Sequence, residues 1–446
     1  MFRLFVLLSI GALAGCAGVP NGASSPAVPA VLTEPAALAP GNYIKHVVVV
    51  IQENRSFDNL FDGFPGADTS PYGYLHNGTK VRLQQIRFVV RDMDHYFSTG
   101  VMDWDHAKMD RFDLNPAAAG GTIGRFAYSY LKRSAVAPYW TIARRYVLAD
   151  HMFPTMFGPS FTAHLTLIAG TADLNPRLSA ADLPTGSPWG CDSPSGTVTE
   201  TVNIDRLIRD GPAPCFTQFR TMADTLDAAG VSWKYYAPSI SGNNGGRLWS
   251  SFDAISSVRN GPDWGAHVVS PPQRILADAK SGALANVSWV VPDALWSDHP
   301  YIGKPYGPSW VASIVNAIGE SPAWKSTAIV IVWDDWGGFY DNVPPPQLDF
   351  RGLGIRVGCL IVSPYVSPHV DHTVYEFGSI LEFIEQTFKL PALGSLTAGY
   401  TDRRSASIVQ SFDFSRRPAE FTAIPAPYPA SFFLQHAPSL RPPDDQ

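Results

Sequence analysis

The segment at residues 46–58 reads His-Val-Val-Val-Val-Ile-Gln-Glu-Asn-Arg-Ser-Phe-Asp. Its first half is a β-branched run that is apolar on both faces, which is typical of a central strand in a parallel sheet covered on both sides. Its second half changes at once to polar and charged side chains. Because open α/β sheets bind ligands beyond the carboxyl ends of their strands, the segment predicts a strand at 46–52 followed directly by part of a functional site.

Other apolar runs along the chain indicate further strands of the same sheet. They span residues 231–236, 287–291, 328–333 and 359–362. Helical patterns alternate with these runs and span residues 221–229, 310–318 and 379–388. This alternation predicts an α/β fold in which a central, mostly parallel β-sheet is covered by helices on both faces. Long loop insertions are expected at 62–130 and 172–215 and would shape the site.

The N-terminus resembles an export signal. Arg3 precedes an apolar run at 4–13 that is too short to span a bilayer, and Leu-Ala-Gly-Cys at 13–16 resembles a bacterial lipobox. We therefore expect a lipoprotein signal peptide at residues 1–15 and a lipid on Cys16. The lipid would anchor an exported protein to a bacterial membrane, in the periplasm or at the cell surface. An ordinary secretory signal with a chance cysteine is the alternative.

The rest of the chain divides by composition. Residues 16–41 are rich in Ala, Pro, Ser and Gly and lack apolar periodicity, so a disordered linker is expected after the lipidated cysteine. One folded domain is expected at 42–415, and a Pro-rich C-terminal tail at 416–446.

Charge and cysteine content limit the classes of function. The 446 residues carry a formal net charge of −6 with no long Lys/Arg run, which argues against a nucleic-acid partner. Local groups such as a metal ion would then hold an anionic substrate. Cys191 and Cys215 are a candidate disulfide, because an exported protein meets an oxidising compartment. Cys359 lies in an apolar run and is expected to be a buried thiol.

Hard oxygen ligands follow two of the predicted strands. Glu53 and Asn54 come after the first strand, and Asp334 and Asp335 come after the run at 328–333. Adjacent carboxylates repel each other unless a cation or a base lies between them. Carboxylate and amide oxygens suit Mg²⁺, Ca²⁺, Mn²⁺ or Zn²⁺, so a divalent metal site is predicted at this edge of the sheet. The alternative is that these side chains only begin a helix or form a solvated turn.

Ser160 and two histidines complete the candidate site. Gly-Pro-Ser at 158–160 precedes a short apolar helix, so the Ser160 hydroxyl is expected at a helix N-terminus, where an anion or a developing alkoxide is stabilised. Serine is also a common helix cap with no further role. His95 and His299 each follow an aspartate, and an acidic neighbour orients an imidazole and raises its basicity. Weaker candidates are His106, His151, His164, His369 and His372. The remaining histidines are expected to be surface or core residues: His46, His76, His267 and His436.

Taken in order, these motifs resemble those of a bacterial phosphoesterase family that contains phospholipases C and a type of acid phosphatase, within the alkaline-phosphatase-like superfamily. Glu-Asn-Arg-Ser-Phe-Asp at 53–58 resembles the first motif of that family. The further motifs are Asp94-His95, Lys-Met-Asp-Arg-Phe at 108–112, the nucleophile segment at 149–160, Asp-His-Pro at 298–300, Asp-Asp-Trp-Gly-Gly-Phe-Tyr-Asp at 334–341, and C-terminal markers at 379–385 and 412–414. The likeness spans about residues 43–415.

The resemblance implies a site as well as a fold. The residues that it places on a divalent metal ion are Glu53, Asn54, Ser160, Asp334 and Asp335. Ser160 is also implied as the nucleophile, and His95 and His299 as groups that contact the phosphate or the leaving group. Positions that depart from the family pattern are Ala163, Asn342 and Phe377. Ala163 lies in Thr-Ala-His at 162–164, where the family usually has Pro-Asn-Arg or Pro-Asn-His.

The predicted function is metal-dependent hydrolysis of phosphate esters through a phosphoserine intermediate. Acid phosphatase is preferred, because Ser160 stands where the family's phospholipases usually carry Thr. Phospholipase C acting on phospholipid head groups near the anchoring membrane is the alternative. A sulfatase is disfavoured, because its nucleophile is followed by x-Pro-x-Arg. A second alternative, motivated by the three departures, is a non-catalytic surface lipoprotein that keeps the fold for binding.

Overall fold

The computed structural model describes residues 38–117, 120–240 and 249–439. The expected signal peptide, Cys16 and most of the expected linker lie outside the described residues, as does the end of the expected C-terminal tail. In the described part of the chain, we find no helix that combines the length and the apolar character needed to cross a membrane.

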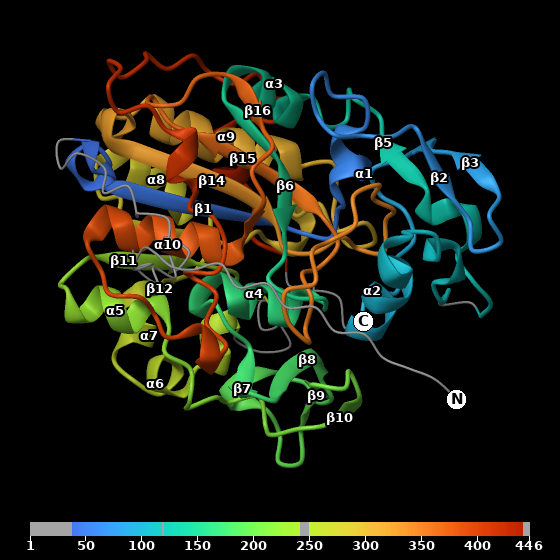
Figure 1. The fold of residues 1–446 in the computed structure, drawn as a ribbon. Coiled ribbons are helices and arrows are strands. Elements are labelled where there is room, and N and C mark those ends of the chain that lie inside the picture. Colours follow the sequence, from blue (N-terminus) through green and yellow to red (C-terminus); the bar gives the residue numbers. More distant parts are fainter. Residues whose placement is uncertain (1–37, 118–119, 241–248, 440–446) are drawn as a thin grey trace, which may run out of the picture. The chain divides into compact units, whose positions relative to one another are not determined.

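A nine-stranded sheet forms the centre of the described residues, with β1 in its interior (Figure 1). The strand order is β12-β11-β13-β1-β14-β15-β6-β16, and β17 also pairs with β6. The bounds are β1 His46–Gln52, β6 Val147–Phe153, β11 Trp233–Tyr236, β12 Val268–Val269, β13 Val287–Val290, β14 Thr327–Trp333, β15 Val357–Val362, β16 His369–Asp371 and β17 Tyr375–Glu376.

The pairings of this sheet are parallel except for those of β15, which runs antiparallel to both β14 and β6. The prediction of a mostly parallel sheet is therefore confirmed. Residues 47–51 are fully buried, as expected for a central strand. β1 pairs with β14 along its whole length, from His46 opposite Thr327 to Gln52 opposite Trp333. The two strands therefore end side by side, and the polar residues that follow them emerge at the same edge.

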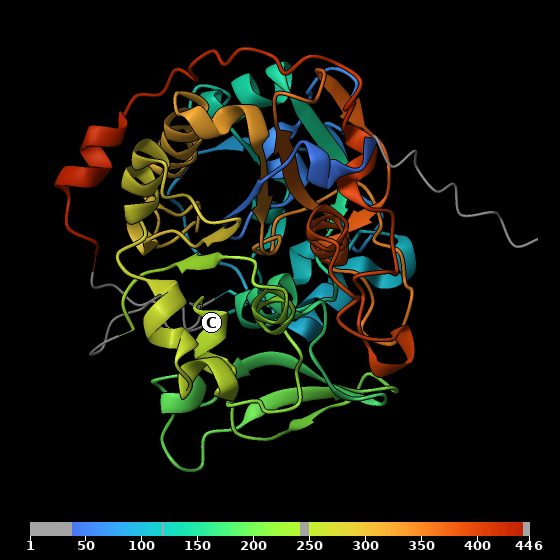
Figure 2. The ribbon, with the colours of Figure 1, turned by 90° about the vertical axis from the view of Figure 1, so that its left-hand side faces the viewer.

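Helices cover both faces of the sheet, as predicted (Figures 1 and 2). Helices α3, α8 and α9 lie on one face, and α4, α5 and α10 on the other. The bounds are α1 Phe57–Phe61, α2 Phe97–Trp104, α3 Ala137–Arg145, α4 Ser160–Ala169, α5 Met222–Ala228, α6 Ser256–Arg259, α7 Asp263–His267, α8 Arg274–Ser281, α9 Gly307–Gly319, α10 Phe377–Phe388 and α11 Ala430–Gln435. The three helices expected from the sequence correspond to α5, α9 and α10.

The two long insertions contain short strands of their own. The bounds are β2 Tyr72–Tyr74, β3 Lys80–Arg82, β4 Gln84–Ile86, β5 Ser129–Leu131, β7 Asp173–Asn175, β8 Leu178–Pro184, β9 Thr199–Asn203 and β10 Ile208–Asp210. Strands β7 to β10 form a four-stranded sheet within the second insertion. Cys191 and Cys215 form a disulfide there, which confirms the candidate pair. Cys359 is a buried free thiol on β15, also as expected.

The part of the expected C-terminal tail that the structure describes packs along α9. Asn316 of α9 exchanges two hydrogen bonds with the backbone of Ile424, at 2.7 and 2.9 Å. Phe433 of α11 is fully buried, and its ring contacts those of Trp296 and Trp310 at centroid distances of 5.4 and 5.3 Å. This segment therefore adds a layer of apolar packing outside α9.

Candidate active site and metal centre

Two loops leave the sheet together at the carboxyl ends of β1 and β14. The Asp334 Oδ1 atom accepts the backbone N–H of Asn54 at 2.9 Å and that of Asp335 at 2.7 Å. Asn54 has a φ of 56°, a left-handed conformation that asparagine adopts more readily than most residues. Gly337 makes the close approach possible, because a Cβ atom at this position would lie 2.3 Å from the Asn54 carbonyl oxygen. The local sequences therefore hold the two loops against each other.

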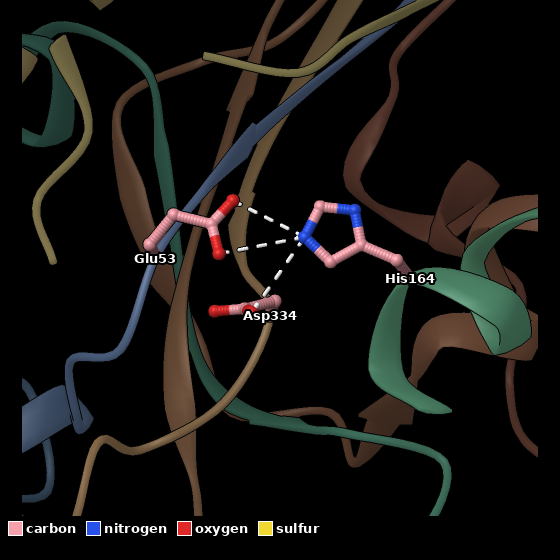
Figure 3. Close-up of side chains that lie close together, drawn as sticks. All are labelled: Glu53, His164 and Asp334. Carbon is pink, nitrogen blue, oxygen red and sulfur yellow. Dashed lines mark hydrogen bonds and ion pairs between the residues drawn. The ribbon is translucent and has the colours of Figure 1, made fainter. Parts of the chain in front are cut away.

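Glu53, His164 and Asp334 form the innermost group of the site (Figure 3). His164 Nε2 lies 3.1 and 3.4 Å from the two carboxylate oxygens of Glu53, and 3.6 Å from Asp334 Oδ2. All three side chains are fully buried. One ligand atom from each lies within 4.8 Å of the others, so the group could hold a metal ion. The mixed nitrogen and oxygen donors suit Zn²⁺ or Mn²⁺ better than the all-oxygen preference of Ca²⁺.

Burial determines the protonation of this group. Burial raises the pKa of Glu53 well above its usual range, and the charge of Asp334 raises it further. Burial lowers the pKa of His164 to about 4, so the imidazole is neutral at pH 7, the form that ligates metals. Within the described residues, Asn54 Oδ1 and Asp334 Oδ2 have no hydrogen-bond partner. Buried oxygen atoms without donors, next to several carboxylates, are satisfied by a bound cation, so these residues fit a divalent metal ion.

Ser160 is the first residue of α4, as predicted, and follows Pro159. Its Oγ atom donates a hydrogen bond to Asp335 Oδ2 at 3.3 Å, and the residue is 4% exposed. The other oxygen of Asp335 accepts the backbone N–H of Gly337 at 2.7 Å. Burial and the adjacent Asp334 carboxylate raise the pKa of Asp335. The hydroxyl therefore lies at a helix N-terminus and beside the second carboxylate of the β14 loop.

His95 contacts both loops. Its Nδ1 atom lies 2.7 Å from the Met93 carbonyl oxygen, and its Nε2 atom lies 3.0 Å from Asn54 Nδ2 and 3.9 Å from Asp335 Oδ2. A carbonyl can only accept and an amide nitrogen can only donate, so these partners assign the ring proton to Nδ1 and the lone pair to Nε2. Asn54 Nδ2 also lies 3.2 Å from Asp335 Oδ1 and therefore joins the imidazole to the carboxylate.

His299 lies next to His95, with 6.5 Å between the ring centroids. The ring of Trp249 lies 6.2 Å from that of His299 and 6.4 Å from that of His164. The tryptophan is fully buried and forms an apolar wall shared by the two histidines.

The carboxylate near His299 differs from the one expected. Asp298, its neighbour in sequence, accepts hydrogen bonds from the Tyr139 hydroxyl at 2.8 Å and from Trp333 Nε1 at 2.9 Å. The carboxylate that lies near His299 Nε2, at 4.0 Å, belongs to Asp92. Successive side chains of an extended segment point in opposite directions, so a sequence neighbour is poorly placed to orient an imidazole.

The structure brings the predicted site residues together at one place, and adds His164. The predicted residues are Glu53, Asn54, His95, Ser160, His299, Asp334 and Asp335. His164 was expected only as a weaker candidate. It follows Ser160 by four residues on α4, so the two side chains lie on the same face of that helix. This spacing is the signal in the sequence that could have identified it.

The other weaker candidates lie elsewhere. His372 Nδ1 pairs with the carboxylate of buried Asp150 at 3.0 Å, and His151 Nδ1 bonds to the carbonyl oxygen of His372. His106 and His369 are exposed.

The three departures from the family pattern have separate environments. Ala163 is buried within α4, and Phe377 is fully buried at the start of α10. Asn342 donates to Asp68 Oδ1 at 3.1 Å and accepts from Arg356 at 2.9 Å.

Comparison with known proteins gives a consistent family assignment. A family model described as the Phosphoesterase family matches residues 44–391, a range that includes every predicted site residue. The chain is 25% identical over 438 residues to phospholipase C B of Mycobacterium tuberculosis, with 84% of this chain and 78% of that protein covered. It is 24% identical to the hemolytic phospholipase C of Pseudomonas aeruginosa, with 77% and 53% covered. It is also 24% identical to non-specific phospholipase C1 of Arabidopsis thaliana, with 78% and 67% covered.

Solved structures resemble the chain more distantly. A protein in the alkaline phosphatase superfamily from Vibrio parahaemolyticus aligns with a TM-score of 0.37 at 10% identity, over 78% of this chain and 66% of that one. The phosphonate monoester hydrolase of Agrobacterium radiobacter aligns with a TM-score of 0.34 at 10% identity, over 78% and 74%.

Proposed function

Since the chain belongs to the phosphoesterase family and is a hydrolase of phosphoric ester bonds, we propose that it is a metal-dependent enzyme with Ser160 as its nucleophile. The observation that carries this proposal is the position of Ser160 Oγ. It lies 3.3 Å from Asp335 Oδ2, while Oδ2 of the adjacent Asp334 lies 3.6 Å from His164 Nε2. The proposed nucleophile therefore contacts Asp335, and the next residue in the chain, Asp334, belongs to the group that could hold a cation.

Residues that would hold the metal ion are Glu53, Asn54, Ser160, His164, Asp334 and Asp335. Asn54 would use its Oδ1 atom, which has no hydrogen-bond partner within the described residues. When bound, a divalent ion supplies positive charge beside the hydroxyl and the phosphate oxygens and offsets the repulsion of the buried carboxylates.

The chain's own groups then account for the proton transfers. The Ser160 proton passes to the Asp335 carboxylate to which it already donates, and Oγ forms a bond to phosphorus. The bond from phosphorus to the leaving oxygen breaks, and His299, or His95 once its Nε2 atom is protonated, donates a proton to that oxygen. Water then attacks phosphorus and gives one proton to that histidine. The bond from phosphorus to Oγ breaks, phosphate is released, and Asp335 returns its proton to Ser160 Oγ.

Two classes of substrate are compatible with this mechanism, phosphomonoesters and phospholipids. Phosphomonoesters are placed first, because Ser160 matches the acid phosphatase type within the family. Phospholipids are the second candidate, supported by relatives that are named phospholipase C. We also propose that the protein is exported, which the Cys191–Cys215 disulfide supports. Anchoring through a lipid on Cys16 stays a prediction from the sequence.

The test compares Ser160→Ala and Asp335→Asn with Ser288→Ala, which alters another buried serine that lies on β13. Each protein is assayed on p-nitrophenyl phosphate and on phosphatidylcholine vesicles, with and without EDTA, and its metal content is measured by elemental analysis. We expect Ser160→Ala to lose on the order of 10³-fold in kcat and Ser288→Ala to keep its activity. Rapid acid quenching followed by mass spectrometry should locate phosphate on Ser160. Full activity of Ser160→Ala would refute the proposal, and wild-type protein with neither metal nor turnover would favour a non-catalytic role.

A further inference from the structure

Arg356 is a fully buried guanidinium just before β15. Its Nε atom donates to Asp341 Oδ1 at 2.8 Å, and its Nη2 atom donates to Asn342 Oδ1 at 2.9 Å and to Asp58 Oδ1 at 3.4 Å. Its Nη1 atom donates to the Asp150 carbonyl oxygen at 2.9 Å. One side chain therefore uses all three of its nitrogen atoms to contact residues far apart in the chain.

The contacted residues belong to the three segments that carry the proposed ligands and nucleophile. Asp58 follows Glu53 and Asn54 on the segment after β1. Asp341 and Asn342 end the segment that begins with Asp334 after β14. Asp150 lies on β6, the strand that leads to Ser160.

Arg356 also contacts the segment after β1 at Phe57, through its own backbone carbonyl and through its guanidinium. Its carbonyl oxygen accepts the backbone N–H of Phe57 at 3.0 Å, and its guanidinium lies 4.3 Å from the centre of the Phe57 ring. Directly beside it, Asp341 Oδ2 accepts the backbone N–H of Asp58 at 3.1 Å, and Asp58 Oδ2 accepts that of Asn342 at 3.0 Å. Hydrogen bonds thus connect the segment after β1 to the segment after β14, and the Arg356 guanidinium contacts both segments at this point.

The charges explain why an arginine is needed at this place. Asp58 and Asp341 are both fully buried, and each lies in the field of the other. Without Arg356, two carboxylates would be buried with only backbone donors, an arrangement that is strongly destabilising. Lysine keeps the charge but loses the planar fork that reaches several acceptors at once, so the two residues are not equivalent here.

We infer that Arg356 is a positioning residue: by joining the segments after β1, after β14 and along β6, it sets the spacing of the proposed metal ligands relative to one another. It touches neither the metal group nor Ser160 in any contact described above, so it acts through the loops. The inference rests on the proposed function, because it assigns a role toward the metal that Glu53, His164 and Asp334 would hold. Outer contacts of this kind change metal affinity by about 10- to 100-fold in other proteins.

The test is the metal affinity of Arg356→Lys, with Arg351→Lys as the matched control. Arg351 is 3% exposed and pairs with Asp173 at 3.1 Å and with Asp349, away from the ligand-bearing segments. The ion that purified wild-type protein retains is identified by elemental analysis. Each protein is then equilibrated against a graded series of EDTA-buffered concentrations of that ion, and its thermal unfolding is followed in parallel. We expect both variants to lose stability, but only Arg356→Lys to bind the ion at least about tenfold more weakly.

A milder variant keeps the inference open to refutation if Arg356→Lys fails to fold. Asn342→Ala removes one acceptor of the guanidinium at a partly exposed position, and we expect it to weaken metal binding in the same direction by a smaller factor. Wild-type affinity in both variants, or equal weakening in Arg351→Lys, would overturn the positioning role and leave the proposed function intact. A wild-type protein that binds no divalent ion would instead refute the proposed function itself.

Discussion

His164 Nε2 lies 3.1 Å from Glu53 Oε1, although 111 positions separate the two residues in the sequence. The contact joins α4 to the end of β1. Because Ser160 lies one helical turn before His164 on the same face of α4, docking this one helix on the sheet edge places both the proposed nucleophile and the imidazole that could ligate a metal ion. The geometry of the site therefore depends on how α4 packs as well as on the two loops.

The first prediction concerns His164. We expect His164→Ala to lower metal affinity and kcat/KM by about 100-fold or more, because it removes a neutral nitrogen donor and leaves two buried carboxylates facing each other. His46→Ala is the control, since His46 lies at the opposite end of β1. Metal content and kcat/KM are measured for both variants. Wild-type metal content in His164→Ala would show that the imidazole is not a ligand.

The second prediction concerns the glycine that lets the two loops meet. Gly337 has a φ of 60°, and a Cβ atom there would lie 2.3 Å from the Asn54 carbonyl oxygen. We expect Gly337→Ala to destabilise the fold by about 1–3 kcal/mol and to reduce kcat/KM at least about tenfold, because Asn54 must move. Gly265→Ala is the matched control: a Cβ atom at Gly265 in α7 would meet no atom within 4 Å, so its stability should be unchanged or slightly higher. Chemical denaturation and steady-state kinetics check both variants, and equal behaviour of the two would contradict the prediction.

The strands and helices that the sequence predicts are those with strong apolar patterns. β1 begins and ends at the predicted residues, and α5 agrees to within one residue at each end. β6 was not predicted, because Asp150 and His151 interrupt its apolar pattern. Asp150 is nevertheless buried, since it accepts hydrogen bonds from His372 and from the backbone of Asp68. A buried polar residue with partners from distant segments gives no local signal of a strand.

In the site, too, residues placed by local sequence patterns could be predicted, and contacts between distant segments could not. Residues at the ends of predicted strands, such as Glu53 and Asp334, could be placed together because neighbouring parallel strands end at one edge. The carboxylate that lies near His299 could not be identified from the sequence, because it belongs to Asp92, in a different segment of the chain. The strands of the two insertions were expected as loops, because most of them have only three residues, too few to show a period of two.

The third prediction is a pH dependence of stability that arises from Asp182 on β8. Burial raises the pKa of Asp182 from 3.8 to about 7, with Glu200 and Asp94 adding to the effect, although the backbone N–H of Phe97 and His95 oppose it. Between pH 4 and pH 7 the folded protein therefore binds a proton at Asp182 that the unfolded chain does not. The free energy of unfolding should fall as pH rises through this range, by on the order of 4 kcal/mol.

Asp182→Asn should remove this contribution, because the amide can still accept from Phe97 and carries no charge. Denaturant unfolding at pH 5 and pH 8 should show that the variant gains stability relative to wild type at the higher pH. Asp210→Asn controls for the loss of one negative charge, because Asp210 is exposed on β10. A stability difference between Asp182→Asn and wild type that does not change with pH would contradict the assignment.

The last prediction concerns the disulfide, whose two cysteines are 24 residues apart in the second insertion. Closing a loop of this length restricts the unfolded chain, so replacing both cysteines by alanine should lower the free energy of unfolding by about 3 kcal/mol. The disulfide lies outside the group formed by Glu53, His164 and Asp334, so kcat/KM of the folded variant should stay near the wild-type value. Cys359→Ala provides a control, because it removes a buried thiol without opening a loop, and its unfolding midpoint should still fall with a reductant because the Cys191–Cys215 disulfide remains. If a reductant leaves the unfolding midpoint of the wild-type protein unchanged, the disulfide does not contribute to stability, and the argument it offers for an oxidising compartment is lost.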